Sequence, residues 1–301
     1  MRSPSPENLT NLQSCLRSHV NVLANLIGPR HLGKPTTMEA AVSYIQRQFT
    51  EIGDTPTLQT YSVANTESSN IIIERLGATI PDQIVIVGAH YDTVISTPGA
   101  DDNASAVAML IEVARLLKPR KLRRTLRFVA FANEEPPHFH MDTMGSQQYA
   151  RACRKADENI VGMICLEMVG FYSDAKNSQH IPPVIPRLVH PLFPKRANFL
   201  ASVANFRSLK LLLSFRRGFK RATKLPLFSV PLPERINEIR LSDNSSFWDQ
   251  NYPALMITDT SFLRNRHYHQ PTDLPETLDY TRLTQATLGV ANAVARISKT
   301  S

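Results

Sequence analysis

Residues 128–137 read FVAFANEEPP, and the interpretation of the whole chain depends on this stretch. Five of its first six residues are apolar, which is typical of a strand that passes through a protein core. The run ends in Asn133 and two adjacent carboxylates, Glu134 and Glu135, followed by two prolines. A water-facing loop would explain such a pair of charges, but so would a site at the end of a buried strand. The residues that follow the other strands distinguish these two explanations.

Apolar runs of strand length recur along the chain, with helical segments between them. We predict strands at 70–76, 83–89, 125–132, 159–167 and 253–260. Apolar residues spaced by three and four predict helices at 6–27, 37–49, 103–117, 145–154 and 279–297. Near-continuous apolar strands that alternate with helices are typical of a sheet covered on both faces. The pattern therefore predicts an α/β fold.

Length and composition favour one domain over residues 1–301. The chain is 42% hydrophobic and 20% charged, so it can bury a substantial core. No internal repeat or Gly/Ser linker divides it. Residues 1–8 are expected to be disordered, and the proline-rich residues 172–236 are interpreted as a lid or insertion region.

The apolar runs are all much shorter than the roughly 18 residues of a membrane span. The start of the chain, MRSPSPENLTN, has no apolar segment typical of a secretory signal. Cys15, Cys153 and Cys165 are widely spaced and form neither a disulfide framework nor a CxxC metal motif. We therefore expect a cytoplasmic protein with free thiols and no membrane span.

A basic segment lies within the least regular part of the chain. Residues 207–224 read RSLKLLLSFRRGFKRATK, with seven basic and no acidic residues, and the net charge of the chain is +8. Basic amphipathic segments can bind nucleic acid or anionic membranes. No known nucleic-acid-binding motif accompanies this one. We interpret it as a solvated helix face with its leucines packed inward, and we expect no nucleic-acid partner.

Polar side chains follow several of the predicted strands. In open α/β sheets, ligands bind at the carboxyl ends of the strands. The side chains expected at that edge are His90, Asp92, Asp101, Asp102, Glu134, Glu135, Glu167, His267, His269 and Asp273. Each motif alone has a simpler explanation, such as a surface turn for the two glutamates or a helix cap for the two aspartates. Their joint placement at one sheet edge favours a common site.

The chemistry of this set indicates a metal site. Several carboxylates cannot share a small pocket unless cations neutralise them or some stay protonated. Histidine and carboxylate ligands without thiolates suit Zn²⁺ in a catalytic site. Two divalent ions roughly 3.5–4 Å apart, bridged by a carboxylate, would satisfy a set of this size.

The ordered motifs resemble those of a known family. They are GAHYDTV, PGADDNASAVAMLIEVARLL, FVAFANEEPP, CLEMVGF, LSDNSSFWDQNYPALMITDT and YHQPTDLPETL, and the similarity covers roughly residues 10–300. The chain resembles the co-catalytic zinc exopeptidases of the bacterial leucyl aminopeptidase type, a family that includes relatives of glutamate carboxypeptidase and the glutaminyl cyclases. The resemblance implies a three-layer α/β/α sandwich around a mixed, mostly parallel sheet.

The resemblance also implies a role for each matching residue. Two zinc ions per chain are expected, bridged by Asp102. His90 and Glu167 would complete one site, and Glu135 and His269 would complete the other. Asp92 would hydrogen-bond the second ring nitrogen of His90 and orient the ring.

The resemblance implies that Glu134 does not bind metal. It would act as the general base, taking a proton from water and passing it to the leaving amine.

Some positions depart from the family pattern. Asn244 stands where a histidine is common, which leaves the substrate contacts near Phe247 and Trp248 undefined. His267 replaces a common aromatic residue. His138 and His140 have ligand-like spacing beside the glutamates but match no family ligand, so both are interpreted as loop residues.

The leading functional hypothesis is a di-zinc aminopeptidase acting on peptides with a free N-terminus. Three alternatives stay open at this stage: a single-zinc glutaminyl cyclase-like acyltransferase, a carboxypeptidase or deacylase, and a receptor-like domain without catalysis. The presence of every expected ligand and of the base argues against the last of these. The side-chain specificity and the oligomeric state do not follow from the sequence.

Overall fold

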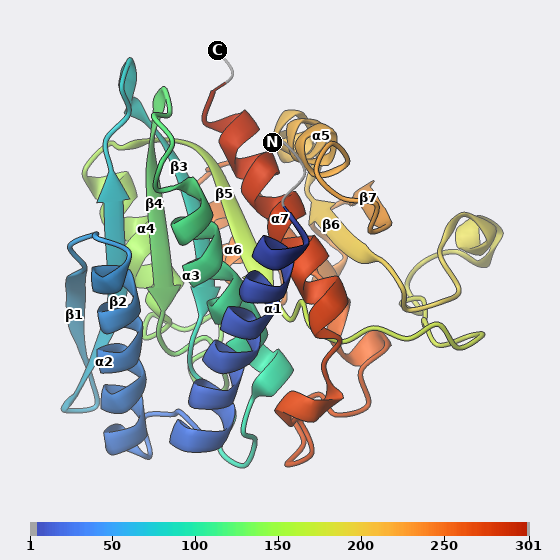
Figure 1. Cartoon of the computed structure of the whole chain (residues 1–301), viewed down its shortest axis with the longest axis horizontal. Helices are drawn as coiled ribbons and strands as arrows, with labels where there is room; N and C mark the ends of the chain where they lie inside the picture. Colours follow the sequence, from blue (N-terminus) through green and yellow to red (C-terminus); the bar gives the residue numbers. More distant parts are fainter. Residues whose placement is uncertain (1–4, 300–301) are drawn as a thin grey trace.

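The computed structural model of the protein describes residues 5–299 and is built around one eight-stranded sheet (Figure 1). The spatial order of the strands is β1-β2-β4-β3-β5-β8-β6-β7. Four of the seven strand pairings, β3–β4, β3–β5, β5–β8 and β6–β7, are parallel. The strands are β1 (Thr57–Val63), β2 (Thr66–Arg75), β3 (Ile80–His90), β4 (Arg124–Phe131), β5 (Asn159–Glu167), β6 (Leu200–Ala204), β7 (Leu227–Pro231) and β8 (Ala254–Thr258).

Helices cover both faces of this sheet. The larger hydrophobic core lies on the face covered by α1, α2, α3, α5 and α7, and a second core lies under α4 and α6. The predicted three-layer α/β fold with a mixed sheet is therefore confirmed. The helices are α1 (Pro6–Asn21), α2 (Pro35–Glu51), α3 (Ala106–Leu117), α4 (Gly145–Lys155), α5 (Leu209–Phe219), α6 (Asn244–Asp249) and α7 (Tyr280–Ile297).

The central strands are apolar throughout because both of their faces are buried. In β3, Val85 and Val87 belong to the larger core, while the alternate residues Ile84 and Ile86 belong to the second core. Successive side chains of a strand point to opposite faces, so a strand between two helical layers must be apolar at nearly every position. The same alternation in β4 accounts for the FVAFA run.

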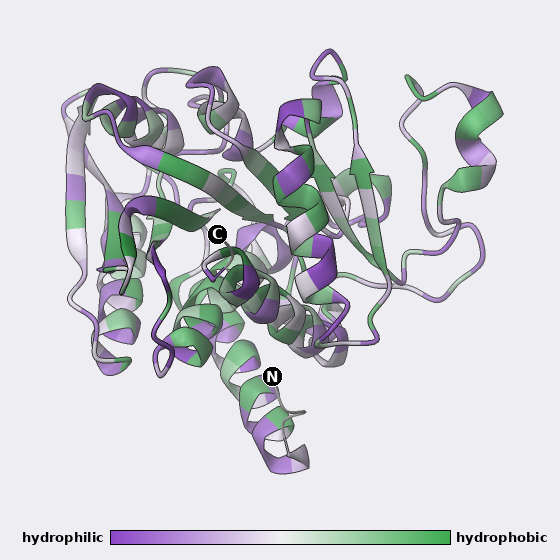
Figure 2. Ribbon diagram, turned by 90° about the horizontal axis from the view of Figure 1, so that it is seen from above, coloured by the Kyte–Doolittle hydropathy of each residue, from purple (hydrophilic) through white to green (hydrophobic). Residues whose placement is uncertain are grey.

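Residues 172–236 do not all lie outside the sheet. β6 and β7 extend the sheet beyond β8, and α5 covers it. Residues 200–231 are therefore part of the sheet and of the helical layer that covers it. The preceding irregular segment projects from the fold and carries a short helical turn (Arg187–Leu192) at its tip (Figure 2).

The amino terminus also differs from the expectation. Helix α1 begins at Pro6, capped by the Ser5 hydroxyl, so residues 6–8 are helical rather than disordered. Residues 1–4 lie outside the described residues. Between residues 5 and 299, no helix combines the length and apolar character needed to cross a bilayer.

Candidate metal centre

The carboxyl ends of the adjacent strands β4, β3 and β5 meet at one edge of the sheet, as does the end of β8. His90 is the last residue of β3, and Glu167 is the last residue of β5. Glu134 and Glu135 follow β4, and His269 lies in the loop between β8 and α7. Asp102 lies in an irregular turn, η2 (Ala100–Ser105), that leads into α3. The fold therefore brings these six side chains, far apart in sequence, to one place.

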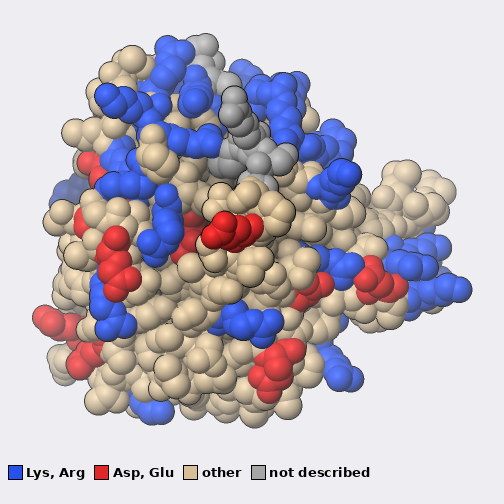
Figure 3. Space-filling model, in the orientation of Figure 1, with Lys and Arg blue, Asp and Glu red and all other residues tan. Residues whose placement is uncertain are grey.

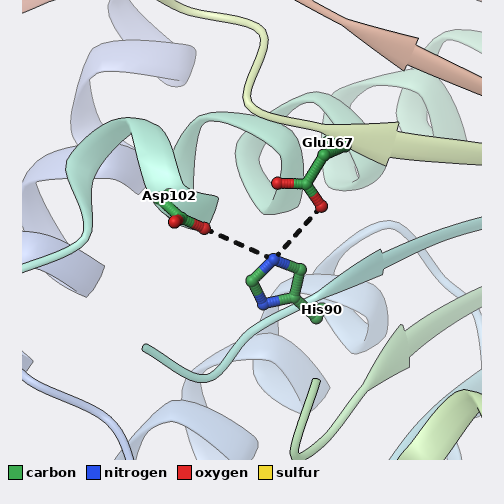
Figure 4. A group of neighbouring side chains, drawn as sticks. All are labelled: His90, Asp102 and Glu167. Atoms are coloured by element: carbon green, nitrogen blue, oxygen red, sulfur yellow. Dashed lines mark ion pairs between the residues drawn. The ribbon is translucent and has the colours of Figure 1, made fainter. Parts of the chain in front are cut away.

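His90, Asp102 and Glu167 form a first group of potential ligands (Figure 4). His90 Nε2 lies 3.4 Å from Asp102 Oδ1 and 3.3 Å from Glu167 Oε2. A tetrahedral shell with zinc–ligand bonds of about 2.0–2.1 Å has edges of about 3.3–3.4 Å. The three atoms are therefore spaced as neighbouring ligands of one zinc ion would be.

Asp102, Glu135 and His269 form a second group. His269 Nε2 lies 3.3 Å from Asp102 Oδ2 and 3.2 Å from Glu135 Oε2. Asp102 thus presents one carboxylate oxygen to each group, which is the arrangement of a bridging ligand. Glu134 belongs to neither group, although its Oε2 lies 3.8 Å from His90 Nε2.

Several of these buried atoms have no hydrogen-bond partner among the described residues. They are His90 Nε2, Asp102 Oδ1, Glu135 Oε1 and His269 Nε2. Buried polar atoms without partners are rare because each one costs about 1–3 kcal/mol. Divalent cations at the two groups would satisfy His90 Nε2, Asp102 Oδ1 and His269 Nε2, so the residues present fit a metal centre.

The pKa shifts of the site also indicate that its carboxylates lack neighbouring positive charge. Burial raises the pKa of Glu134 well above its usual range, and the neighbouring Glu135 and Glu167 raise it further. Burial, followed by repulsion from Asp102, raises the pKa of Glu135 to about 8. Burial alone would lower the pKa of His269, but Asp102 and Glu135 raise it to about 10. Bound cations would relieve this crowding of carboxylates.

The side chain of Asp92 binds the backbone of the two adjacent glutamates. Its Oδ1 accepts the N–H of Glu134 and its Oδ2 accepts the N–H of Glu135, both at 3.0 Å. The carboxylate also faces His90 Nδ1 at 3.5 Å, although the shorter contact of this nitrogen, at 3.2 Å, is to the Asp92 carbonyl. Asp92 therefore connects the end of β3 to the turn after β4.

Asp273 plays the matching part on the other side of the site. Its carboxylate accepts the backbone N–H of Asp101 at 2.9 Å and that of Asp102 at 3.0 Å. The sequence places Asp273 at the correct edge but assigns it no role. In the sequence, Asp273 is marked only by its position four residues after His269. The backbone donors that it binds lie about 170 residues away, so the contact cannot be recognised from the sequence.

Two further residues support the site and escape prediction from the sequence. Ser242 donates from Oγ to Glu167 Oε2 at 2.6 Å and so orients this carboxylate. Arg30 is fully buried, and its guanidinium donates to backbone carbonyls on both sides of the loop after β3, at Tyr91 and Pro98. An arginine that binds only backbone carbonyls leaves no recognisable motif.

The remaining candidates lie outside both groups of ligands. His138 Nδ1 contacts the Thr143 hydroxyl, and His267 Nδ1 contacts the Thr272 hydroxyl. Phe247 and Trp248 are buried in the second core, so neither side chain is open to the surface of the site.

An apolar pocket of about 100 Å³ opens beside Glu167. It lies along the outer strands of the sheet, under the irregular segment that precedes β6. This volume suits one apolar side chain rather than a whole peptide. Its walls include Phe199, Ala201, Val203, Phe228, Val230 and Met256.

Comparison with known proteins agrees with this geometry. Residues 70–294 match Peptidase family M28. The chain is 34% identical over 297 residues to the uncharacterized protein YfbL of Escherichia coli (strain K12), covering 96% of this chain and 87% of YfbL.

Solved structures share the fold. BSAP, a zinc aminopeptidase from Bacillus subtilis, matches with a TM-score of 0.76 and 17% identity, over 95% of each chain. The glutaminyl cyclase of Porphyromonas gingivalis matches with a TM-score of 0.67 and 18% identity, over 94% of this chain and 97% of the cyclase. The resemblance predicted from the motifs is confirmed, and the chain belongs to Peptidase family M28.

Proposed function

We propose that the protein is a zinc-dependent aminopeptidase that hydrolyses the N-terminal bond of peptides. The observation that carries this proposal is the pair of ligand groups that share Asp102, with Glu134 beside them but in neither. The family membership supports peptide hydrolysis, and the likeness to BSAP supports the choice of zinc and of aminopeptidase chemistry.

The two groups would hold one zinc ion each. His90, Asp102 and Glu167 would bind the first ion, and Asp102, Glu135 and His269 would bind the second. Zinc in such a site lowers the pKa of water and polarises a carbonyl group. The backbone contacts of Asp92 and Asp273 would hold the ligand-bearing turns rigid, so that little reorganisation is needed when metal binds.

Glu134 would move the proton during the reaction. Its carboxylate would accept a proton from the attacking water, whose oxygen forms the new bond to the scissile carbonyl carbon. When the C–N bond breaks, Glu134 would return that proton to the leaving nitrogen. Glu134 is buried, so its carboxylate is poorly solvated and accepts a proton more readily than a carboxylate in water.

The apolar pocket beside Glu167 would receive the side chain of the N-terminal residue. A pocket with apolar walls favours aliphatic and aromatic residues because each buried CH₂ contributes about 0.8 kcal/mol. We therefore expect leucine, methionine or phenylalanine at the substrate N-terminus.

The proposed activity can be tested with a pair of substrates that differ only at the amino group. The protein should hydrolyse leucine p-nitroanilide, lose this activity on treatment with a chelator, and regain it with Zn²⁺. N-acetyl-leucine p-nitroanilide should not be cleaved, and elemental analysis should find two zinc ions per chain. Preferential cleavage of the acetylated substrate would indicate a deacylase. A single zinc ion together with cyclisation of N-terminal glutamine peptides would indicate a glutaminyl cyclase-like enzyme instead.

The role of Asp273 leads to a prediction about metal affinity. Asp273→Asn replaces one of the two carboxylate oxygens with an amide NH₂ group. This group cannot accept a hydrogen bond, so one of the contacts with the backbone N–H groups of Asp101 and Asp102 is lost. Loss of an outer contact of this kind weakens metal binding by about 10–100-fold. Zinc titration of the chelator-treated protein should show weaker binding, and activity should recover at high zinc concentration. An unchanged titration curve would contradict the positioning role.

A further inference from the structure

The solvent-facing side of α5 carries an apolar stripe that the fold does not use. Phe206, in the turn before the helix, is 61% exposed, Leu209 is 39% exposed and Leu213 is 38% exposed. Their spacing of three and four residues places them in one row on the helix surface. The sequence predicted that the leucines of this segment pack inward. Leu209 and Leu213 are instead partly exposed.

Close packing on the inner side of α5 prevents the helix from rotating to bury this stripe. A Cβ on Gly218 would lie 2.5 Å from Ala293 Cα, and one on Gly289 would lie 2.4 Å from the Phe219 ring. Such contacts mean that α5 and α7 pack closely at both glycines, without spare room. The rotation of α5 is thus set by its buried face, and the stripe stays at the surface.

Seven cations lie in the same segment as the stripe. None of them takes part in the ion pairs found within residues 5–299, although Arg207 donates a hydrogen bond to Asn251. Figure 3 shows Lys and Arg side chains grouped at the upper right of the molecule, where α5 lies in Figure 1. All seven are exposed, and they are Arg207, Lys210, Arg216, Arg217, Lys220, Arg221 and Lys224.

We propose that this face of α5, from Phe206 to Lys224, docks the protein on an anionic lipid surface. Apolar side chains beside a cluster of cations are the two features that bind a helix to such a surface: the apolar groups enter the headgroup boundary and the cations contact the lipid phosphates. A nucleic-acid surface would use the cations but has no need of three exposed apolar side chains in a row. The stripe therefore favours lipid.

Docking through α5 leaves the metal centre accessible. Strand β6 runs antiparallel to β8, so it ends away from the edge that holds the ligand groups, and the first turns of α5, which follow it, lie at the upper end of the molecule in Figure 1. No residue of this face belongs to either ligand group. Variants of this face should leave the chemistry at the metal centre unchanged, which separates a test of docking from a test of the proposed peptidase function.

The experiment is co-sedimentation of the full chain with vesicles. The protein should bind vesicles of phosphatidylcholine and phosphatidylglycerol, release at high salt, and bind pure phosphatidylcholine poorly. Arg216→Gln/Arg217→Gln should weaken binding to the anionic vesicles by about 30-fold, since each cation near such a surface contributes about 1 kcal/mol. Phe206→Ser/Leu213→Ser should weaken it by about tenfold or more. Circular dichroism and thermal melting of each variant should match the wild type because all four side chains are exposed.

A matched control removes two cations elsewhere. Lys121→Gln/Arg123→Gln changes two exposed cations in the α3–β4 connection and should weaken vesicle binding much less than the α5 variants. Equal loss in the control and in the α5 variants would overturn the proposal, because binding would then depend only on net charge. The proposal would also fail if binding were equal on neutral and anionic vesicles or absent from both. Tighter binding to duplex DNA than to the anionic vesicles, unaffected by Phe206→Ser/Leu213→Ser, would assign the face to nucleic acid instead.

Discussion

Glu134→Gln should lower kcat by about a thousandfold while the protein keeps its full complement of zinc. General acid–base catalysis contributes about 10²–10⁴-fold to a rate, and glutamine has the shape of glutamate but cannot accept the proton. Glu134 lies outside both ligand groups, and its Oε2 lies 3.8 Å from His90 Nε2. The variant should therefore separate turnover from metal binding. The measurements are steady-state kinetics on leucine p-nitroanilide and zinc per chain by elemental analysis.

The neighbouring glutamate provides the control. Glu135→Gln changes the same functional group one residue along the chain, but Glu135 Oε2 contacts His269 within the second ligand group. This variant should lose zinc from that group as well as activity. If Glu134→Gln retained wild-type turnover, or lost zinc as Glu135→Gln does, the division of roles between the two glutamates would be wrong.

Asp102→Asn should have the largest effect on metal content, because Asp102 is the residue common to both ligand groups. Its two oxygens face His90 Nε2 at 3.4 Å and His269 Nε2 at 3.3 Å. An amide nitrogen in place of one oxygen removes a ligand and adds a donor beside a cation. We expect zinc per chain to fall from two to nearly none after dialysis, with activity reduced by more than about a thousandfold.

Thermal melting with and without zinc gives an independent measure of this loss. A ligand at about 100 times its Kd stabilises the folded state by about 2.7 kcal/mol. Zinc should therefore raise the Tm of the wild type but leave that of Asp102→Asn nearly unchanged. His267→Ala is the matched control, since His267 shares a loop with His269 but contacts Thr272 instead of a ligand group. An unaltered zinc response in Asp102→Asn would rule out its bridging role.

The central part of the fold follows from local sequence patterns. The strands β2, β3, β4, β5 and β8 were predicted within a few residues, because a strand buried on both faces is apolar at nearly every position. The outer strands were missed. β1 and β7 are partly exposed, and β6 (LASVA) is rich in alanine and serine, so none of the three shows a continuous run of strand-forming apolar residues.

The candidate ligands could also be named from the chain alone. The carboxyl ends of neighbouring parallel strands meet at one edge, so the polar residues after each strand are brought together whatever their separation in sequence. Resemblance to a known family then suggested a different role for each of the two glutamates. The structure places all six predicted side chains at this edge, with Asp102 in both ligand groups.

The supporting contacts are a property of the tertiary structure. Asp92 and Asp273 each accept two successive backbone N–H groups, and Ser242 orients Glu167. The same is true of the pocket, whose walls include residues of β6 and β7 that the sequence did not reveal as strands, and of the exposed stripe on α5. Periodicity and motifs are local and record which residues can form an element or bind a metal. Which backbone groups those residues meet depends on strand order and helix rotation, and these are set by packing between segments distant in the chain.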